Sequence, residues 1–112
     1  MSGNLPVLMA EFVTAKNRHD GAAITACFAE DATVYDEGER IQGHTEIRKW
    51  IDAANVKYKV SYDFLDYSED GENALLTLMV SGEFEGSPLP LDYQLKVNSG
   101  KITELRIVLS EK

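Results

Sequence analysis

The chain has 112 residues, of which 44% are hydrophobic, 9% aromatic and 27% charged, a composition typical of one soluble globular domain. Its formal net charge of -8 argues against a nucleic-acid partner, because phosphate binding requires clustered positive side chains. No apolar run is long enough to span a membrane, and the single cysteine, Cys27, cannot close an intramolecular disulfide. The sequence therefore predicts one cytoplasmic domain over residues 1–112, without membrane contact.

The first half of the chain has the pattern of three amphipathic helices. They are predicted over residues 6–18, 21–28 and about 44–55. In the first helix, apolar side chains recur at helical spacing, and Lys16 is expected on the opposite, polar face. A strand is expected between the second and third helices, over residues 32–36, because that segment is rich in β-branched and aromatic residues.

After Asn55 the spacing of apolar residues changes from the 3.6 of a helix to the 2 of a strand. Alternating segments are predicted over residues 57–64, 75–84, 89–98 and 104–109, with turns at 70–71, 85–87 and 98–100. Helices grouped before an antiparallel meander are typical of an α+β domain, in which the helices pack on one sheet face. This pattern disfavours a parallel, doubly wound fold.

The sheet face that points away from the helices is also partly apolar. The side chains expected on this outer face are Tyr35, Leu65, Leu75, Met79 and Val108. Since a large apolar patch on a small domain commonly marks an interface, we predict a two-fold homodimer through the outer sheet face. Single apolar side chains are also normal on a monomer's surface, so a monomer stays open as the alternative.

Motifs that cover nearly the whole chain resemble one protein family. They occupy residues 12–17, 20–21, 27–36, 43–51 and 100–106. Together they resemble the nuclear transport factor 2-like superfamily, most closely its SnoaL-like (polyketide cyclase-like) and ketosteroid isomerase-like branch. The resemblance implies three helices packed on a strongly curved, mostly antiparallel sheet, a cone-shaped, cystatin-like barrel with a central pocket. The superfamily includes isomerases, cyclases, dehydratases and binding modules, so the fold does not determine the function.

The side chains turned inward by the alternation are expected to line this pocket and to hold a small, largely apolar organic molecule. The predicted lining residues are Phe12, Phe28, Val34, His44, Trp50, Ile51, Tyr58, Leu78, Leu95, Leu105, Ile107 and Leu109. Core packing stays open as an alternative for Trp50, and helix capping for His44. No zinc-type spacing of ligands accompanies either histidine, so we expect no metal and no cofactor.

Asp36 is the candidate catalytic residue. It ends a strand whose alternation puts Val34 and Asp36 on the same inward side, where an apolar residue is the default. The resemblance implies that Asp36 moves a proton next to a substrate carbonyl, and the hydroxyl of Tyr62 or Tyr93 is the candidate hydrogen-bond donor. In the alternative interpretation, Asp36 only caps the turn that follows the strand.

The chain also departs from the ketosteroid isomerase pattern. Phe12 stands where the resemblance implies a tyrosine that donates to the oxyanion, and Ile51 replaces a supporting tyrosine. Asp92 aligns with a protonated aspartate of those enzymes, but the alternation places it on the outer face. Because loss of one oxyanion donor costs about 10²- to 10³-fold in rate, the isomerase mechanism does not carry over. Two functions stay open: ligand binding without assigned activity, and an isomerase, cyclase or lyase reaction with Asp36 as general base.

Overall fold

The computed structural model describes residues 6–36, 38–58 and 60–110, with the side chains of residues 57 and 58 left out. Its helices are α1 (Val7–Asn17), α2 (Gly21–Ala26) and α3 (His44–Tyr58). Its strands are β1 (Phe28–Asp36), β2 (Glu39–Gln42), β3 (Ser61–Asp70), β4 (Asn73–Ser81), β5 (Leu89–Asn98) and β6 (Lys101–Leu109). These elements confirm the α+β class and the grouping of the helices before most of the strands.

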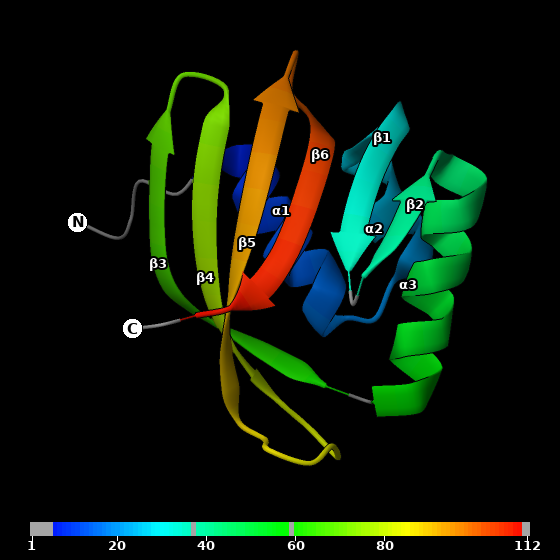
Figure 1. The fold of residues 1–112 in the computed structure, drawn as a ribbon, viewed down its shortest axis with the longest axis vertical. Helices are drawn as coiled ribbons and strands as arrows, with labels where there is room; N and C mark the ends of the chain where they lie inside the picture. Colours follow the sequence, from blue (N-terminus) through cyan, green and yellow to red (C-terminus); the bar gives the residue numbers. More distant parts are fainter. Residues whose placement is uncertain (1–5, 37, 59, 111–112) are drawn as a thin grey trace.

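The strands form one curved sheet in the order β2-β1-β6-β5-β4-β3 (Figure 1). All neighbouring pairs are antiparallel except β1 and β6, which run parallel. The predicted mostly antiparallel sheet is therefore confirmed. The sheet is not closed into a full barrel, because β2 and β3 remain as its two edges.

The three helices lie on one face of the sheet (Figure 1). Helix α1 contacts β3, and α3 contacts β1 and β2, while α2 joins the two longer helices. Alternate strand residues turn toward the helices and form the core. The largest fully buried side chains are Met9, Phe12, Phe28, Val34, Ile47, Leu76, Leu78, Tyr93, Ile102 and Leu105.

Pairing between distant segments overrides the local pattern at two helix boundaries. Helix α2 ends at Ala26 instead of residue 28, because the carbonyl of Cys27 accepts a hydrogen bond from the Ile102 amide and Phe28 pairs with Ile102 in β6. Helix α3 continues to Tyr58, so the strand predicted from residue 57 begins only at Ser61. The expectations of a helix over 27–28 and of a strand at 57, 58 and 60 were wrong, and residue 59 lies outside the described residues.

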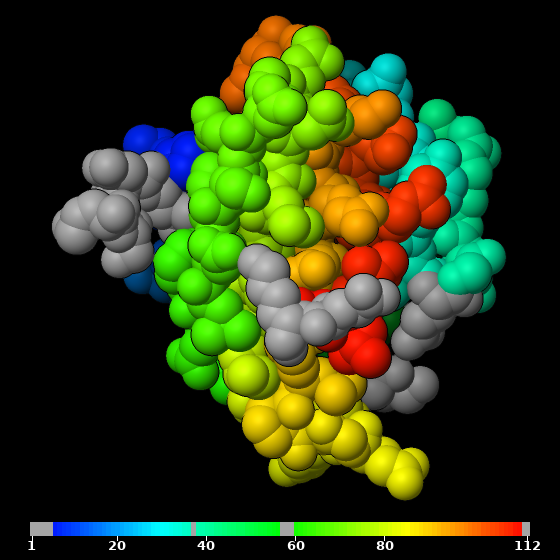
Figure 2. Space-filling view, turned by 60° about the vertical axis from the view of Figure 1, so that its left-hand side comes forward, coloured from blue at the N-terminus to red at the C-terminus, as the bar shows by residue number. Residues whose placement is uncertain are grey.

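Two further differences concern short or irregular segments. Strand β2 was not predicted, because its four residues are mostly polar and too few to show an alternation. The strand predicted to end at Phe84 ends at Ser81, and residues 82–88 form a longer connection that projects from the body of the molecule (yellow in Figure 2). Within it, the Gly82 amide donates to Ser87 Oγ at 2.8 Å, and the Ser87 amide donates to the Phe84 carbonyl.

Strand β5 shows the predicted alternation. Asp92 lies on the outer face, where Thr77 Oγ donates to Asp92 Oδ1 at 2.7 Å, while Tyr93 faces inward and is 2% exposed. On the same outer face, the guanidinium of Arg106 stacks on the Tyr35 ring at 4.3 Å. Across the segments that the structure describes, no helix has the length and apolar character needed to cross a membrane.

Candidate functional site

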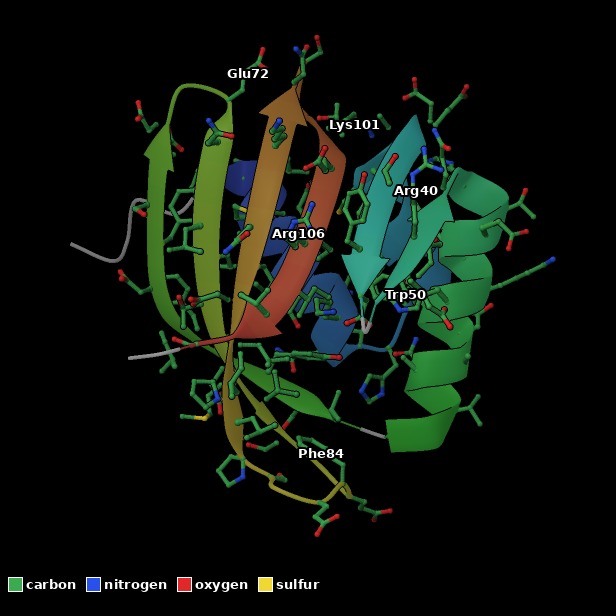
Figure 3. All side chains as sticks on the ribbon, viewed as in Figure 1. Arg40, Trp50, Glu72, Phe84, Lys101 and Arg106 are labelled. Carbon is green, nitrogen blue, oxygen red and sulfur yellow. The ribbon has the colours of Figure 1, made fainter. Side chains whose placement is uncertain are left out.

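A cavity of about 600 Å³ lies at one end of the helix-covered sheet face. Its walls come from the ends of β1, β4 and β6, the beginnings of β3 and β5, helix α3 and the connection between β4 and β5. Figure 3 shows Trp50 projecting from α3 toward the end of β1, and Phe84 in the β4–β5 connection. Most of the lining is apolar, and the polar groups include Lys16, Tyr62 and Tyr93.

The rest of this sheet face is filled. The Phe12 ring of α1 packs edge-on against Phe28, with ring centroids 6.0 Å apart, and against Tyr93, at 6.2 Å. Leu78 and Leu105, from the middle of their strands, are fully buried beneath the helices. The hollow therefore begins where α1 no longer covers the sheet, beyond the Phe12 and Tyr93 rings.

Asp36 lies at the wall of this cavity, as the last residue of β1. The indole N–H of Trp50 donates to Asp36 Oδ2 at 3.1 Å. Trp50 reaches this position because it follows Ile47 on the stripe of α3 that faces the sheet, and Ile47 is fully buried. The contact orients the Asp36 carboxylate, so Trp50 is part of the site as well as part of the cavity wall.

Lys16 is a member of the cavity wall that the sequence interpretation placed on the polar face of its helix. That placement was wrong, because the side chain is only 9% exposed. Its ammonium lies 4.4 Å from the centroid of the Tyr62 ring, 5.2 Å from that of Tyr93 and 5.3 Å from that of Phe12. Since residues four apart share a helix face, the spacing of Phe12 and Lys16 already carried this signal.

The end of α1 is fixed to β3 by a pair of hydrogen bonds. The Asn17 side chain donates to the Tyr62 carbonyl at 2.9 Å and accepts from the Tyr62 amide at 2.7 Å. The following turn is also held, because a ring nitrogen of His19 is hydrogen-bonded to the Val60 carbonyl. These contacts hold Lys16 next to the Tyr62 ring.

Lys16, Asp36, Tyr62 and Tyr93, which all line the cavity, interact electrostatically. Burial lowers the pKa of Lys16 from 10.5 to about 8, and the Asp36 carboxylate opposes this change. Burial raises the pKa of Tyr62 to about 12. The pKa of Tyr93 lies well above 10, because it is buried and because Tyr62 and Asp36 are close. At neutral pH, Lys16 is therefore mostly an ammonium, and both tyrosines keep the proton that a hydrogen-bond donor needs.

The structure divides the predicted lining residues between the cavity and the solid core. Those that line the cavity are Trp50, Ile51, Tyr62, Tyr93, Ile107 and Leu109. Those that lie in the core are Phe12, Phe28, Val34, Leu78, Leu95 and Leu105. His44 lies at the start of α3, where its Nε2 is hydrogen-bonded to the Phe28 carbonyl at 2.7 Å, away from the cavity. The Tyr58 side chain is outside the described residues.

Phe84, Leu89 and Leu91 also line the cavity, and the sequence interpretation did not include them. The alternation gave a usable signal for Leu89 and Leu91, which fall in register with the inward Tyr93. The predicted alternation also put Phe84 on the side of Leu78, although the strand ends at Ser81 and Phe84 reaches the cavity from the β4–β5 connection. In the described part of the chain, no three His, Cys, Asp or Glu side chains gather in the way that a metal ion would need.

We expect Lys16→Met to stabilise the protein at pH 7. Lys16 has a pKa of about 8 in the folded chain and 10.5 as its ordinary value, so the unfolded chain binds more protons between these two pH values and stability rises with pH across that window. Below pH 8, Lys16 is charged in both states, and burial of its charge lowers the free energy of unfolding by about 3 kcal/mol. Urea unfolding is expected to show the variant more stable by roughly this amount at pH 7, with the difference shrinking toward pH 10.

Lys49→Met is the control, because Lys49 is exposed on α3, where it pairs with Glu46 at 3.5 Å. It loses the same charge from the surface, and its free energy of unfolding is expected to differ little from that of the wild type. If the free energies of unfolding of wild type and Lys16→Met differ by the same amount at every pH from 7 to 10, Lys16 is not a buried, charged amine in the folded protein.

Comparison with known proteins agrees with this architecture. The model of the SnoaL-like domain family matches residues 9–105. A presumed polyketide cyclase from Sinorhizobium meliloti superimposes with a TM-score of 0.90 at 36% identity, covering 96% of this chain and 99% of that one. No curated protein matches the sequence.

More distant structures share the fold. A hypothetical protein with a ketosteroid isomerase-like fold from Catenulispora acidiphila, in complex with trimethylamine, has a TM-score of 0.85 at 19% identity, covering 96% of this chain and 88% of that one. A cystatin-fold protein from Novosphingobium aromaticivorans has a TM-score of 0.75 at 16% identity, with 90% and 94% covered. The family match and the 36% identical structure together show that the chain belongs to the SnoaL-like domain family.

Proposed function

We propose that the cavity binds a small, largely apolar organic molecule. The observation that carries this proposal is the cavity itself, about 600 Å³ in volume, which lies within the size range of small-molecule sites. Its walls are mainly apolar, and its few polar groups gather around Lys16, Asp36 and the two tyrosines. Such a site buries an apolar body and orients it through a few placed polar contacts.

Ligand binding can be tested through Trp50, which is the protein's single tryptophan and lines the cavity. A fragment collection of neutral aromatic and alicyclic molecules is screened by the chemical shift of the Trp50 indole N–H in a ¹⁵N-labelled sample. Fragments that bind the cavity are expected to move this signal, with dissociation constants in the millimolar to micromolar range, as befits small fragments.

Leu91→Phe is a variant that partly fills the cavity, since Leu91 lines it from β5, and it leaves Trp50 as the single indole. The variant is expected to bind the fragments more weakly while it keeps the dispersed spectrum of a folded protein. If none of the fragments moves the Trp50 signal, or if the filled variant binds them equally well, the cavity is not a binding site.

A catalytic function is the second candidate. The observation that favours it is that Asp36, Tyr62 and Tyr93 line the same cavity, and that Asp36 and Tyr62 both affect the pKa of Tyr93. In this proposal the Asp36 carboxylate removes a proton from carbon next to a ligand carbonyl, and a tyrosine hydroxyl donates to the oxygen that becomes negative. The reaction class would be isomerisation, cyclisation or elimination.

Asp36→Asn tests the catalytic proposal. The asparagine keeps an oxygen that can accept from the Trp50 indole, but it is not a base. We expect it to lower the rate of deuterium exchange at the α-carbon of cyclohexanone by about 10²-fold or more, measured by proton NMR in D₂O. Tyr93→Phe is expected to lower the rate less. Equal exchange rates in wild type and Asp36→Asn contradict a role as general base.

We also propose that two copies associate through the outer sheet face. Figure 2 shows strands β3 to β6 side by side on this face, with no helix over them. The half-buried Leu75 and Met79 supply apolar surface there, next to Val108, which is 36% exposed and also borders the cavity. Such a surface is in keeping with the isologous contact that a two-fold dimer needs.

Sedimentation equilibrium tests this association. The wild type is expected to sediment as a dimer, and Met79→Glu as a monomer, because the charge falls within the proposed contact. Val56→Glu is the matched control, since Val56 is 76% exposed on α3 and lies off the sheet. A monomeric wild type, or a dimeric Met79→Glu, contradicts the proposed interface.

A further inference from the structure

Lys16 lines the cavity, and no carboxylate of the described residues forms an ion pair with its ammonium. The ion pairs found among the described residues join Arg48 to Asp52 at 3.0 Å and Lys49 to Glu46 at 3.5 Å, both on the surface of α3. The Asp36 carboxylate acts on Lys16 as a charge that raises its pKa, against the larger effect of burial. A buried cation of this kind gains from an anionic partner at close range.

The aromatic rings around Lys16 stabilise its charge but do not provide its N–H groups with hydrogen-bond acceptors. They stabilise its charge through their faces, but an ammonium also has three N–H groups that need acceptors. Among the described residues, no hydrogen bond from Lys16 Nζ to another residue is found. Because Lys16 lines the cavity, a molecule bound there lies next to its ammonium and can supply such an acceptor.

The polar end of the cavity is rich in donors. Lys16 contributes an ammonium, and Tyr62 and Tyr93 contribute hydroxyls that stay protonated because burial raises their pKa. Asp36 is an acceptor there that already accepts from the Trp50 indole, and Asn55 and Glu85 also line the cavity. Such a group of donors complements an oxygen that bears a negative charge.

We infer that the molecule bound in the cavity is an organic acid, whose anionic oxygen pairs with the ammonium of Lys16 while its apolar body lies against the walls. This inference rests on the proposed function and names its ligand class. The attraction of Lys16 for an anion acts at short distance, whereas the protein's net charge of -8 repels anions at longer range. Within the cavity, the low dielectric strengthens the pairing of Lys16 with an anion.

Three probes that share one apolar body test the inference: cinnamate, cinnamyl alcohol and cinnamylamine. Their dissociation constants are measured at pH 7 from the shift of the Trp50 indole N–H signal. We expect cinnamate to bind at least 10-fold more tightly than the alcohol, and the amine to bind most weakly because it meets the Lys16 charge. In Lys16→Met, cinnamate is expected to lose this advantage while the alcohol binds as well as before.

Lys49→Met is the matched control, because it removes one positive charge from the exposed surface of α3. It is expected to keep the preference for cinnamate. The indole spectrum also reports whether each variant is folded, and methionine suits the apolar surroundings of Lys16.

The pH dependence gives a second readout. Between pH 7 and 9.5 cinnamate stays ionised, while Lys16 loses its proton around its pKa of about 8. Of the other groups that line the cavity, Asp36 and Glu85 are carboxylates, and Tyr62 and Tyr93 hold their protons to higher pH. The affinity for cinnamate is therefore expected to fall as pH rises through 8, and the affinity for the alcohol to stay constant.

The outcomes separate the two proposals. If none of the three probes moves the Trp50 signal, both the binding cavity and its preference for acids are overturned. If the alcohol or the amine binds as tightly as cinnamate, or if Lys16→Met keeps the preference, the cavity binds ligands but Lys16 does not select an acid.

Discussion

The unequal covering of one curved sheet face determines where chemistry can occur in this protein. The inward side chains of six strands present more apolar surface than three helices cover. Helix α1 fills the middle of the face with Phe12, and α3 stands over the edge strands β1 and β2. At the remaining end, the apolar side chains of β4, β5 and β6 line an open volume together with residues of α3 and the ends of α1 and α2. The cavity follows from the lengths and positions of the helices.

The sequence predicts the architecture well because its main signals are periodic. A spacing of 3.6 residues marks the helices and a spacing of 2 marks β3 to β6, and both extend over enough residues to be unambiguous. The boundaries of the elements were less predictable. The end of α2, for example, depends on a backbone hydrogen bond from the Ile102 amide to the Cys27 carbonyl, which are distant in the sequence. Strand β2 has four residues, and it exists because β1 offers it an edge to pair with.

The candidate site was predictable only in part, for a different physical reason. Alternation tells which side of the sheet a residue faces, and so it placed Asp36, Tyr62 and Tyr93 on the inner side. It does not tell which inward residues are covered by a helix, so Val34 and Leu78 could not be distinguished from true lining residues. Lys16 was missed because we assigned it to the polar face from its charge, although its spacing from Phe12 puts it on the buried face of the helix. Long polar side chains can bury their apolar stems.

Lys16 gives a reason to regard the cavity as more than a packing defect. An ammonium held among Phe12, Tyr62 and Tyr93 has a lowered pKa, which means that the fold is less stable with this charge than without it. An apolar side chain of similar length at the same point on α1 would remove that cost and fit the same surroundings. Residues that reduce stability without improving packing are concentrated at functional sites, where the group is needed for binding or catalysis. The pair of hydrogen bonds from Asn17 to Tyr62 points the same way, because it fixes the residue next to Lys16 and so holds the charge at the cavity wall.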